Sequence, residues 1–589
     1  METRFEWHYK SANPLAAAEY QKLNVSELLA QVLVNRGISA REFAKISYHF
    51  DDLRTEYLES IVDLEKACEY FIERTDNLRN RNKKIYIFAD YDADGITSAA
   101  IANITLKKLG FNPVVHVPER SEGYGLSRKW CEELIRANQE NQNRERPLVV
   151  TFDNGITKAD EVELLKSSGI DVIVTDHHEP CGDIPDCIVV DPKKDSGRKG
   201  SELCGAAIAY IFFYKILDKA GYEDNKLKDS ILALAAIGTI ADMMQMTTFN
   251  AALCKSGLEV LNKGGFAPLD ALKRALGLID VSSKDIGFSL AACINACGQL
   301  GKARFAYSLF DDLEADEDDL RRAAVGMCRL QEENKAITKK AKQAAEKEIE
   351  CGSFDSDKCC IYSAKDLPLG TAGKVAQHIS QLTGKPAIVF PLYKEEQEEL
   401  RGSARSGASG LNLLEILQGL VEEGRMEYAN GHGAACGCGL KAAELEYVKA
   451  LINKRIGELE AEGKISPAAP APLLIDAHIS MDDINLKTYK ELIKIPFSMN
   501  MYQPLFLIEG KILDAVPSKN NPKNICYTVM DLYPHDEDRP RIMKFWAWNL
   551  YPDEYSPEKY STIKIVGNIN RNFMSPSSLT MDITDMKFE

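Results

Sequence analysis

The stretch FADYDADGITSAA, residues 88–100, decides the fold class because it sets three carboxylates at the end of an apolar run. Asp90, Asp92 and Asp94 follow the run 85–89 and precede a glycine and a helix-like segment. In an extended chain every second side chain lies on one face, so the three aspartates are expected to converge. Like charges this close raise one another's pKa unless a cation neutralises them. The spacing therefore favours a divalent metal site over a solvated acidic loop.

Two later runs repeat the pattern of an apolar strand followed by a carboxylate. Residues 148–152 precede DNG (153–155), and residues 171–175 precede DHH (176–178). Strands separated by helical stretches, each with a carboxylate at its C-terminal end, predict an open α/β sheet with ligands at its carboxyl edge. Imidazole together with carboxylate favours Mn²⁺, Zn²⁺ or Fe²⁺ over Mg²⁺ or Ca²⁺ alone.

A fourth motif delivers one more carboxylate. Residues 231–240 read as a buried apolar helix that ends in GTIADMM and carries Asp242 at its end. Taken by itself, Asp242 is equally well explained as a surface carboxylate at a helix terminus. The other motifs shift the interpretation towards a fourth contribution to the metal site.

The motifs described above also resemble those of a known family. DYDADG, DNG, DHH and GTIAD stand in the order and rough spacing of the four motifs of the DHH phosphoesterases, and the chain is most similar to the RecJ branch, the single-strand-specific 5′→3′ exonucleases. Four further motifs support the resemblance: VPERSEGYGLS (117–127), LCGAAIAY (203–210), GSARS (402–406) and NGHGAACG (430–437). It covers most of the chain from about residue 84 and thins after residue 467.

The resemblance implies a centre of two Mn²⁺ or Mg²⁺ ions, with Asp153 as the bridging ligand. The implied ligands are Asp92, Asp94, Asp153, His177 and Asp242. Asp90 and Asp176 are assigned a catalytic part as groups that orient these ligands through hydrogen bonds. His178 is expected to stabilise the pentacovalent charge or to protonate the leaving oxygen, and its alternative role is that of a satisfied core histidine.

The resemblance also implies a phosphate-binding set from a second domain. The substrate-binding residues are Ser403, Arg405, Gly431, His432 and Asn295. Small residues before an amphipathic helix in LPLGTAGKVAQHISQLTG add backbone N–H groups that can hold phosphate. The chain departs from the family where Cys293 and Gln299 replace two usual arginines, and Lys302 or Arg304 is the expected compensation.

Composition limits the classes of function. The formal net charge of −16 means that affinity for nucleic acid must come from a local basic groove rather than from the global field. The 15 cysteines form no pair of C-x₂-C motifs, so they are read as reduced packing residues. No apolar stretch is long enough to span a bilayer, and residues 1–11 are charged rather than signal-like. A soluble, cytoplasmic protein is expected.

The predicted organisation is an α/β protein of several parts. A helical N-terminal extension (1–76) precedes a parallel-sheet DHH catalytic domain (77–301), a connecting helix (302–352) and an α/β DHH-associated domain (353–464). After the proline-rich break ISPAAPAP, alternating apolar and polar runs predict a β-barrel (465–589), and the resemblance implies an OB-fold. The aromatics Tyr527, Phe545, Trp546 and Trp548 are candidates for stacking on bases, although no more than about half are expected to touch nucleic acid because strand aromatics are more often in the core.

The sequence therefore predicts a metal-dependent exonuclease that releases nucleotides from single-stranded DNA in DNA repair or recombination. One alternative is a phosphodiesterase of short oligonucleotides or cyclic dinucleotides, but the extra C-terminal barrel favours a longer polymer. Another is a non-catalytic replication or repair scaffold, which has no physical need to keep mutually repelling carboxylates. The expected partner is single-stranded nucleic acid, taken as DNA, without a membrane. The sequence identifies no helicase or single-strand-binding protein as a partner.

Overall fold

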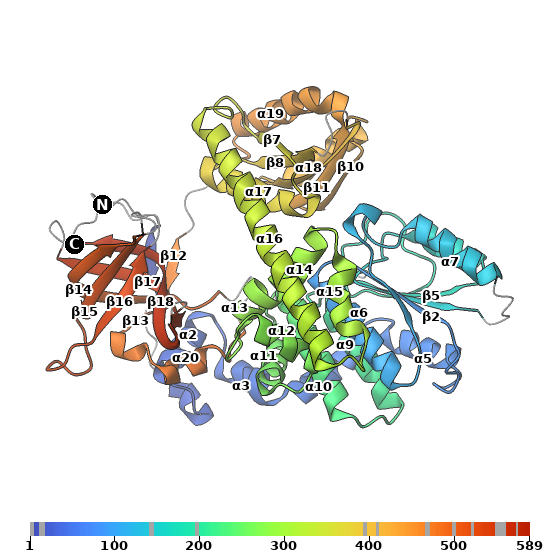
Figure 1. The fold of residues 1–589 in the computed structure, drawn as a ribbon, viewed down its shortest axis with the longest axis horizontal. Helices are drawn as coiled ribbons and strands as arrows, with labels where there is room; N and C mark the ends of the chain where they lie inside the picture. Colours follow the sequence, from blue (N-terminus) through green and yellow to red (C-terminus); the bar gives the residue numbers. More distant parts are fainter. Residues whose placement is uncertain are drawn as a thin grey trace.

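The computed structural model describes residues 5–10, 18–140, 146–194, 200–392, 397–407, 411–465, 472–496, 502–519, 524–547, 561–572 and 575–589. These ranges contain a parallel sheet, a mixed sheet, a mostly antiparallel C-terminal sheet and a short two-stranded pair (Figure 1). The predicted α/β class with an additional C-terminal β domain is confirmed. No helix in these ranges is long and apolar enough to cross a membrane.

The N-terminal extension is mostly helical. Its elements are β1 (Trp7–Tyr9), η1 (Glu19–Leu23), α2 (Glu27–Asn35), α3 (Ala40–Tyr48), α4 (Phe50–Ser60) and α5 (Leu64–Arg74). The prediction of a helical extension missed β1, which pairs in parallel with β12 (Leu473–Ile475) near the other end of the chain. A three-residue strand whose partner lies so far along the chain leaves no local signal in the sequence.

The catalytic region is built on an all-parallel sheet. Its strands are β2 (Ile85–Ala89), β3 (Val114–His116), β4 (Leu148–Phe152), β5 (Asp171–Thr175) and β6 (Ile188–Val190). They lie in the order β3-β2-β4-β5-β6. After β2 the chain adds β3 on one side and then β4 on the other, so the direction of winding reverses between β2 and β4. Ligands of open α/β sheets bind at the carboxyl ends of strands at such a switch point.

The helices of this region pack on the sheet and on one another. They are η2 (Arg120–Glu122), α6 (Ala93–Lys108), α7 (Arg128–Glu140), α8 (Ala159–Ser167), α9 (Gly205–Lys219), α10 (Asn225–Ala241), α11 (Thr248–Lys263), α12 (Ala267–Ala275), α13 (Ser283–Asp285), η3 (Ile286–Leu290), α14 (Ala291–Gln299) and α15 (Ala303–Asp311). Every residue of β4 and β5 is buried, as expected for a parallel sheet with both faces covered. Helix α6 is buried on almost all of its surface because α9, α10 and α15 pack around it.

One long helix joins this region to a second α/β domain. Helix α16 (Glu317–Glu350) runs from the catalytic helices to the upper domain, where α17 lies against it (Figure 1). The second domain contains β7 (Cys360–Lys365), η4 (Leu369–Thr371), α17 (Ala372–Thr383), β8 (Ala387–Leu392), β9 (Glu399–Arg405), α18 (Leu413–Glu422), β10 (Tyr428–His432), β11 (Ala435–Lys441), η5 (Ala442–Glu444) and α19 (Leu445–Ala461). Its mixed sheet has the order β10-β11-β9-β8-β7.

The C-terminal domain has the strand order of an OB-fold. After β12 come β13 (Ala477–His478), η6 (Met481–Asp483), α20 (Leu486–Leu492), β14 (Phe506–Pro517), β15 (Ile525–Asp531), β16 (Ile542–Ala547), β17 (Thr562–Asn572) and β18 (Ser575–Phe588). The order β16-β15-β14-β17-β18 is the Greek-key order of a five-stranded barrel, and β16 and β18 approach each other. Tyr527 and Phe545 are buried in the core and Trp546 is half-buried. Trp548 lies outside the described residues.

The extension and the C-terminal domain are joined by buried polar contacts. Arg36 lies 2.7 Å from Asp476, and the exposed fractions of their side chains are 9% and 1%. The Asn35 amide donates to the Asp476 carbonyl at 2.7 Å, and the Trp7 indole donates to Asp585 at 2.7 Å. Removing the C-terminal domain would leave Arg36 without its counter-charge, so truncation is not a clean test of that domain. The predicted domain boundaries stay a prediction.

Candidate metal centre

The first motif forms a strand-to-helix turn at the end of β2. Asp90 follows the strand, Asp92 is the N-cap of α6 and accepts a hydrogen bond from Gly95 N at 3.0 Å, and Asp94 lies in the first turn. The expected strand-like alternation is therefore wrong, because the backbone turns into a helix after Asp92. The turn is tight: a Cβ atom at Gly95 would lie 2.4 Å from the Asp90 carbonyl oxygen.

Asp94 is held by the N-terminus of a neighbouring helix. Its carboxylate accepts hydrogen bonds from Gly205 N at 2.7 Å and from Ala206 N at 2.9 Å, at the start of α9. A helix N-terminus stabilises negative charge at this point. On the other side, a Cβ atom at Gly238 would lie 2.5 Å from Asp94 Oδ1, so the glycine of GTIAD makes room for the carboxylate. The same helix, α10, ends at Asp242, which is its C-cap.

Asp153 lies at the end of β4 in the left-handed region, with a φ of 64°. Its side chain is almost fully buried, at 3% exposure. The next residue fixes this turn, because the Asn154 amide donates to the Phe88 carbonyl at 3.3 Å and to the Phe152 carbonyl at 2.8 Å. Asn154 thereby ties β4 to β2 across the switch point.

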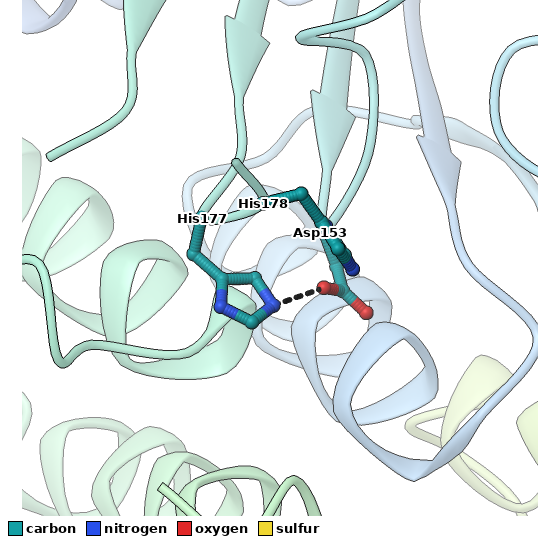
Figure 2. Close-up of side chains that lie close together, drawn as sticks. All are labelled: Asp153, His177 and His178. Carbon is teal, nitrogen blue, oxygen red and sulfur yellow. Dashed lines mark ion pairs between the residues drawn. The ribbon is translucent and has the colours of Figure 1, made fainter. Parts of the chain in front are cut away.

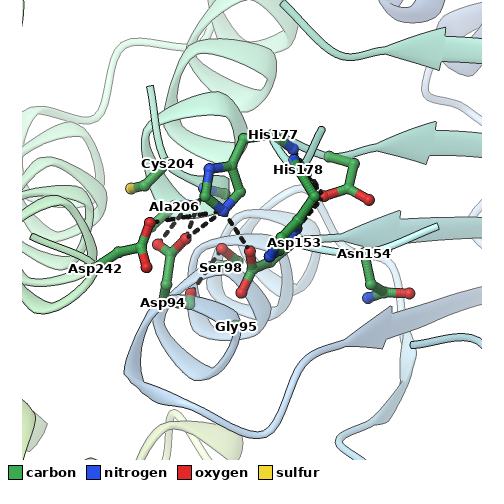
Figure 3. A network of polar contacts seen from close by, with 12 residues as sticks. Asp94, Gly95, Ser98, Asp153, Asn154, His177, His178, Cys204, Ala206 and Asp242 are labelled. Atoms are coloured by element: carbon green, nitrogen blue, oxygen red, sulfur yellow. Dashed lines mark hydrogen bonds and ion pairs between the residues drawn. The ribbon is translucent and has the colours of Figure 1, made fainter. Parts of the chain in front are cut away.

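His177 is the point at which the motifs meet. Its Nε2 atom lies 3.0 Å from Asp153 Oδ1, 3.7 Å from Asp94 Oδ2 and 3.7 Å from Asp242 Oδ2 (Figure 2 and Figure 3). The three carboxylates come from α6, β4 and α10, which are separated along the chain but adjacent in space. One imidazole therefore contacts three of the sequence-predicted ligands.

Three overlapping groups of side chains have ligand atoms within 4.8 Å of one another and could hold metal ions. They are Asp153, His177 and His178; Asp94, His177 and Asp242; and Asp90, Asp92 and Asp153. Asp153 and His177 each belong to two groups. All five predicted ligands are included, and Asp90 and His178, to which other roles were assigned, stand at ligand distance as well. Their assignment to distinct roles stays a prediction.

The donor set fits divalent cations. Asp90 Oδ1 and Asp153 Oδ1 are buried, and neither accepts a hydrogen bond from the described residues, although Asp153 Oδ1 forms the ion-pair contact with His177 Nε2 at 3.0 Å. Carboxylate and imidazole are ligands that suit Mn²⁺, and carboxylate suits Mg²⁺. Buried carboxylate oxygens without a hydrogen-bond donor are costly, and a cation would satisfy them.

Burial and mutual repulsion raise the pKa values of the aspartates in the site. Burial and the charge of Asp92 raise the pKa of Asp94 to about 6 and that of Asp90 to about 8. Burial and the charge of Asp94 raise the pKa of Asp242 to about 8, and the same two causes raise the pKa of Asp153 well above its usual value. These shifts follow from burial and from like charges held close together, and a cation bound by the carboxylates would oppose them.

Asp176 orients His178 and the DNG turn. Its Oδ1 atom accepts from His177 N at 2.7 Å and contacts His178 Nδ1 at 2.8 Å, and its Oδ2 atom accepts from Ile156 N at 2.9 Å. Burial lowers the pKa of His178, but the hydrogen bond and charge of Asp176 outweigh it and raise this pKa to about 9. The predicted orienting group is therefore hydrogen-bonded to the predicted acid.

Two residues of the site escaped the sequence analysis. The Tyr124 hydroxyl lies 3.0 Å from His178 Nδ1, and the two rings meet edge to face. Asp191 follows β6, is buried, and has a pKa raised to about 7 by burial and the charge of Asp176. The rule of a strand followed by a carboxylate would have found Asp191, and the family-like motif VPERSEGYGLS (117–127) contains Tyr124 without assigning it a role.

The predicted substrate-binding residues fall in two places. Asn295 lies on α14, and its Oδ1 atom accepts from Ala93 N at 2.8 Å, so it holds the first metal motif. Arg405 and Ser403 lie on β9, and a Cβ atom at Gly373, at the start of α17, would lie 2.5 Å from Arg405 Nη2. Gly431 and His432 lie on β10, and the side chain of His432 is outside the described residues.

The guanidinium of Arg405 has no carboxylate partner among the described residues. It donates to Ser403 Oγ at 2.9 Å and to the Ala404 carbonyl at 2.8 Å. Burial lowers the pKa of Arg405. A partly buried cation beside a helix N-terminus is suited to an anionic ligand.

Cys293 and Gln299 stand where the family usually has arginines, and their surroundings differ from the expected compensation by Lys302 or Arg304. Gln299 Oε1 accepts from Lys374 Nζ at 2.7 Å, and Lys374 belongs to the second domain. Arg304, an expected compensating group, is instead paired with Glu122 at 2.8 Å. Cys293 is a fully buried free cysteine, in agreement with its reading as a packing residue.

Part of the sequence matches a family model, and most of it is similar to known proteins. Residues 84–239 match the profile of the DHH family, N-terminal domain. The chain is 30% identical over 505 residues to the single-stranded-DNA-specific exonuclease RecJ of Bacillus subtilis (strain 168), a match that covers 84% of this chain and 60% of that protein. It therefore spans less than two thirds of that relative. With the Haemophilus influenzae protein of the same name the identity is 28% over 483 residues, with coverage of 76% and 79%.

Solved structures are similar as well. The exonuclease RecJ bound to manganese has a TM-score of 0.56 and 27% identity, and the match covers 68% of this chain and 96% of that chain. RecJ in complex with Mn²⁺ from Thermus thermophilus has a TM-score of 0.77 at 22% identity, with coverage of 99% and 80%. The second likeness extends the shared fold over nearly the whole chain.

Proposed function

The chain is a RecJ-like member of the DHH family, and from this we propose that it is a metal-dependent exonuclease that degrades single-stranded DNA from the 5′ end in DNA repair or recombination. The observation that carries the proposal is the convergence of Asp94, Asp153 and Asp242 on His177 at the switch point of the parallel sheet. We also propose a cytoplasmic location, because the substrate of such an enzyme arises in DNA repair or recombination inside the cell.

The two cations are proposed to be Mn²⁺ or Mg²⁺. Their ligands would be the predicted set, Asp92, Asp94, Asp153, His177 and Asp242. When bound, such cations polarise a phosphodiester and lower the pKa of the attacking water. The raised pKa values of the carboxyl groups support this assignment, because a positive charge at the site would relieve the repulsion that raises them.

The remaining residues position the substrate and move a proton. His178 has a raised pKa and a fixed orientation on Asp176, so it is suited to donate a proton to the leaving oxygen. Asn295 holds the turn at Ala93 and thereby positions the first motif rather than contacting the substrate. Arg405, beside the first turn of α17, is proposed to grip the substrate phosphate from the second domain.

A digestion assay tests the proposal. End-labelled single strands, duplexes, short oligonucleotides and cyclic dinucleotides are incubated with the full chain in Mn²⁺, Mg²⁺ or EDTA. The proposal expects mononucleotides from single strands only, from the 5′ end and only with a divalent cation. Preference for cyclic dinucleotides or two-residue oligomers would assign the enzyme to small-substrate phosphodiesterases, and no hydrolysis of any substrate would favour a scaffold.

A pair of arginine variants separates the clamp from the metal centre. Arg405→Ala is expected to bind Mn²⁺ normally and to lose about a hundredfold in rate, since misplaced substrate costs that much. Arg401→Ala is the matched control, because Arg401 lies on the same strand but forms an exposed pair with Glu399 at 3.6 Å. Weakened Mn²⁺ binding in Arg405→Ala would place that residue at the metal centre, and unchanged cleavage would make it an ordinary surface group.

A further inference from the structure

A basic cavity opens where α16 meets α17. It has a volume of about 400 Å³ and is lined by Lys335, Thr338, Lys339, Lys342, Gln343, Glu346 and Lys374. On α16 the lysines are spaced by four and three residues, so they lie on one face of the helix. The fourth lysine comes from the first turn of α17, in the second domain.

The positive charge of this cavity is largely uncompensated. Among the residues that the structure describes, no carboxylate pairs with Lys339, Lys342 or Lys374. The acidic neighbours are already engaged: Glu346 contacts His378 at 2.7 Å, and Glu332 pairs with Lys335 at 2.7 Å. In a chain with a net charge of −16, these lysines form a local concentration of positive charge that attracts an anionic ligand.

The cavity is connected to the metal centre through one short helix. Lys374 Nζ donates to Gln299 Oε1 at 2.7 Å, and the Asn334 amide of α16 donates to the same oxygen at 2.7 Å. Gln299 ends α14, and one turn earlier on that helix Asn295 accepts from Ala93 N in the first metal motif. The cations therefore lie beside the element that positions the predicted catalytic turn.

We propose that this cavity, defined by Lys335, Lys339, Lys342 and Lys374, binds the backbone phosphates of single-stranded DNA next to the metal centre. The inference rests on the proposed function and names the part of the chain that supplies the local basic groove. A row of ammonium groups along a helix contacts phosphates as point charges without reading the bases. The site would thus hold a strand independently of its sequence.

A double variant with a matched control tests the site. Lys339→Ala with Lys342→Ala removes two cavity cations, and Lys340→Ala with Lys347→Ala removes two exposed lysines of the same helix that do not line the cavity. Binding of a labelled oligothymidylate to the full chain is measured in EDTA, which prevents hydrolysis, over a range of salt concentrations. Circular dichroism confirms that both variants are folded.

The expected result is a change in salt dependence that only the cavity variant shows. Each phosphate contact of a single strand contributes about −0.7 to the log–log slope, so the slope should become shallower by about 1.4. At 0.1 M salt this corresponds to a loss of affinity on the order of 20-fold that disappears towards 1 M. Mn²⁺ binding should be unchanged, because neither replaced lysine belongs to the groups of candidate metal ligands.

Two outcomes would overturn the inference. The first is that the log–log slope of DNA affinity against salt is equal in the wild type, the cavity variant and the control, although the wild type degrades single strands. The second is loss of tripolyphosphate binding in the cavity variant with an unchanged DNA slope, which would assign the cavity to a free polyphosphate. If the wild type neither binds nor cleaves single strands, the proposed function itself fails, and this result is distinct from both.

Discussion

Replacing Asp153 with asparagine should abolish activity and at the same time stabilise the metal-free protein. The charge of Asp153 is buried and repelled by Asp94, and its Oδ1 atom accepts no hydrogen bond from the described residues. Asparagine has nearly the same shape and tolerates the left-handed backbone, with a φ of 64° at this position. Alanine would add backbone strain, so Asp153→Asn isolates the effect of the charge.

The carboxyl groups of the site set the scale of this effect. The pKa of Asp94 rises from an ordinary value of 3.8 to about 6. A difference of about two pH units corresponds to about 3 kcal/mol. Because Asp153→Asn removes one repelling charge but leaves the others, we expect it to raise the free energy of unfolding of the metal-free protein by about 2 kcal/mol at pH 8.

The sign of the pH dependence follows from the raised pKa values. The folded metal-free protein keeps protons that the unfolded chain has already released. Its stability therefore falls as the pH rises above about 4, where the unfolded carboxyl groups lose their protons. The fall continues until the pH passes the pKa of each group in the folded protein, which is about 6 for Asp94 and about 8 for Asp242. The variant has one such carboxyl fewer, so its stability should fall less steeply. The two proteins should converge near pH 4, where the carboxyl groups are protonated.

Thermal and urea unfolding in EDTA and in Mn²⁺ at several pH values measure these quantities. Wild type should gain stability from Mn²⁺, about 2.7 kcal/mol at a hundredfold excess over the dissociation constant, and the variant should gain little. A metal-free variant that is less stable than wild type at pH 8 would show that Asp153 makes net favourable contacts. Retained hydrolysis in the variant would refute the role of Asp153 in the metal centre.

Two further substitutions distinguish positioning from chemistry. Asn295→Ala should weaken Mn²⁺ affinity by about 10–100-fold, because the turn at Ala93 loses its acceptor. A raised KM for DNA with unchanged Mn²⁺ affinity would instead return Asn295 to the substrate-binding set. His178→Ala should slow cleavage by about 10²–10⁴-fold. A DNA linkage with a bridging sulfur, whose leaving group needs no proton, should recover most of this rate, and an equal defect on both linkages would argue against His178 as the acid.

The candidate ligands could be predicted because each lies where a local pattern ends. A buried strand or helix is recognised from consecutive apolar residues; Asp153 and Asp242 follow such runs directly, and His177 follows one after a single residue. The geometry of the first motif could not be predicted in the same way. Alternation suggested an extended chain, but capping by Asp92 and the close approach at Gly95 turn the backbone into α6.

The sequence by itself determined that carboxylates and imidazole stand at the ends of apolar elements, because secondary structure depends on the period of neighbouring side chains. Only the tertiary structure decided which of these ends meet. The amides of Gly205 and Ala206 reach Asp94 from a distant part of the chain, and Lys374 reaches Gln299 from another domain. Such contacts depend on how whole helices and sheets pack, and a packing arrangement leaves no signal in any short stretch of chain.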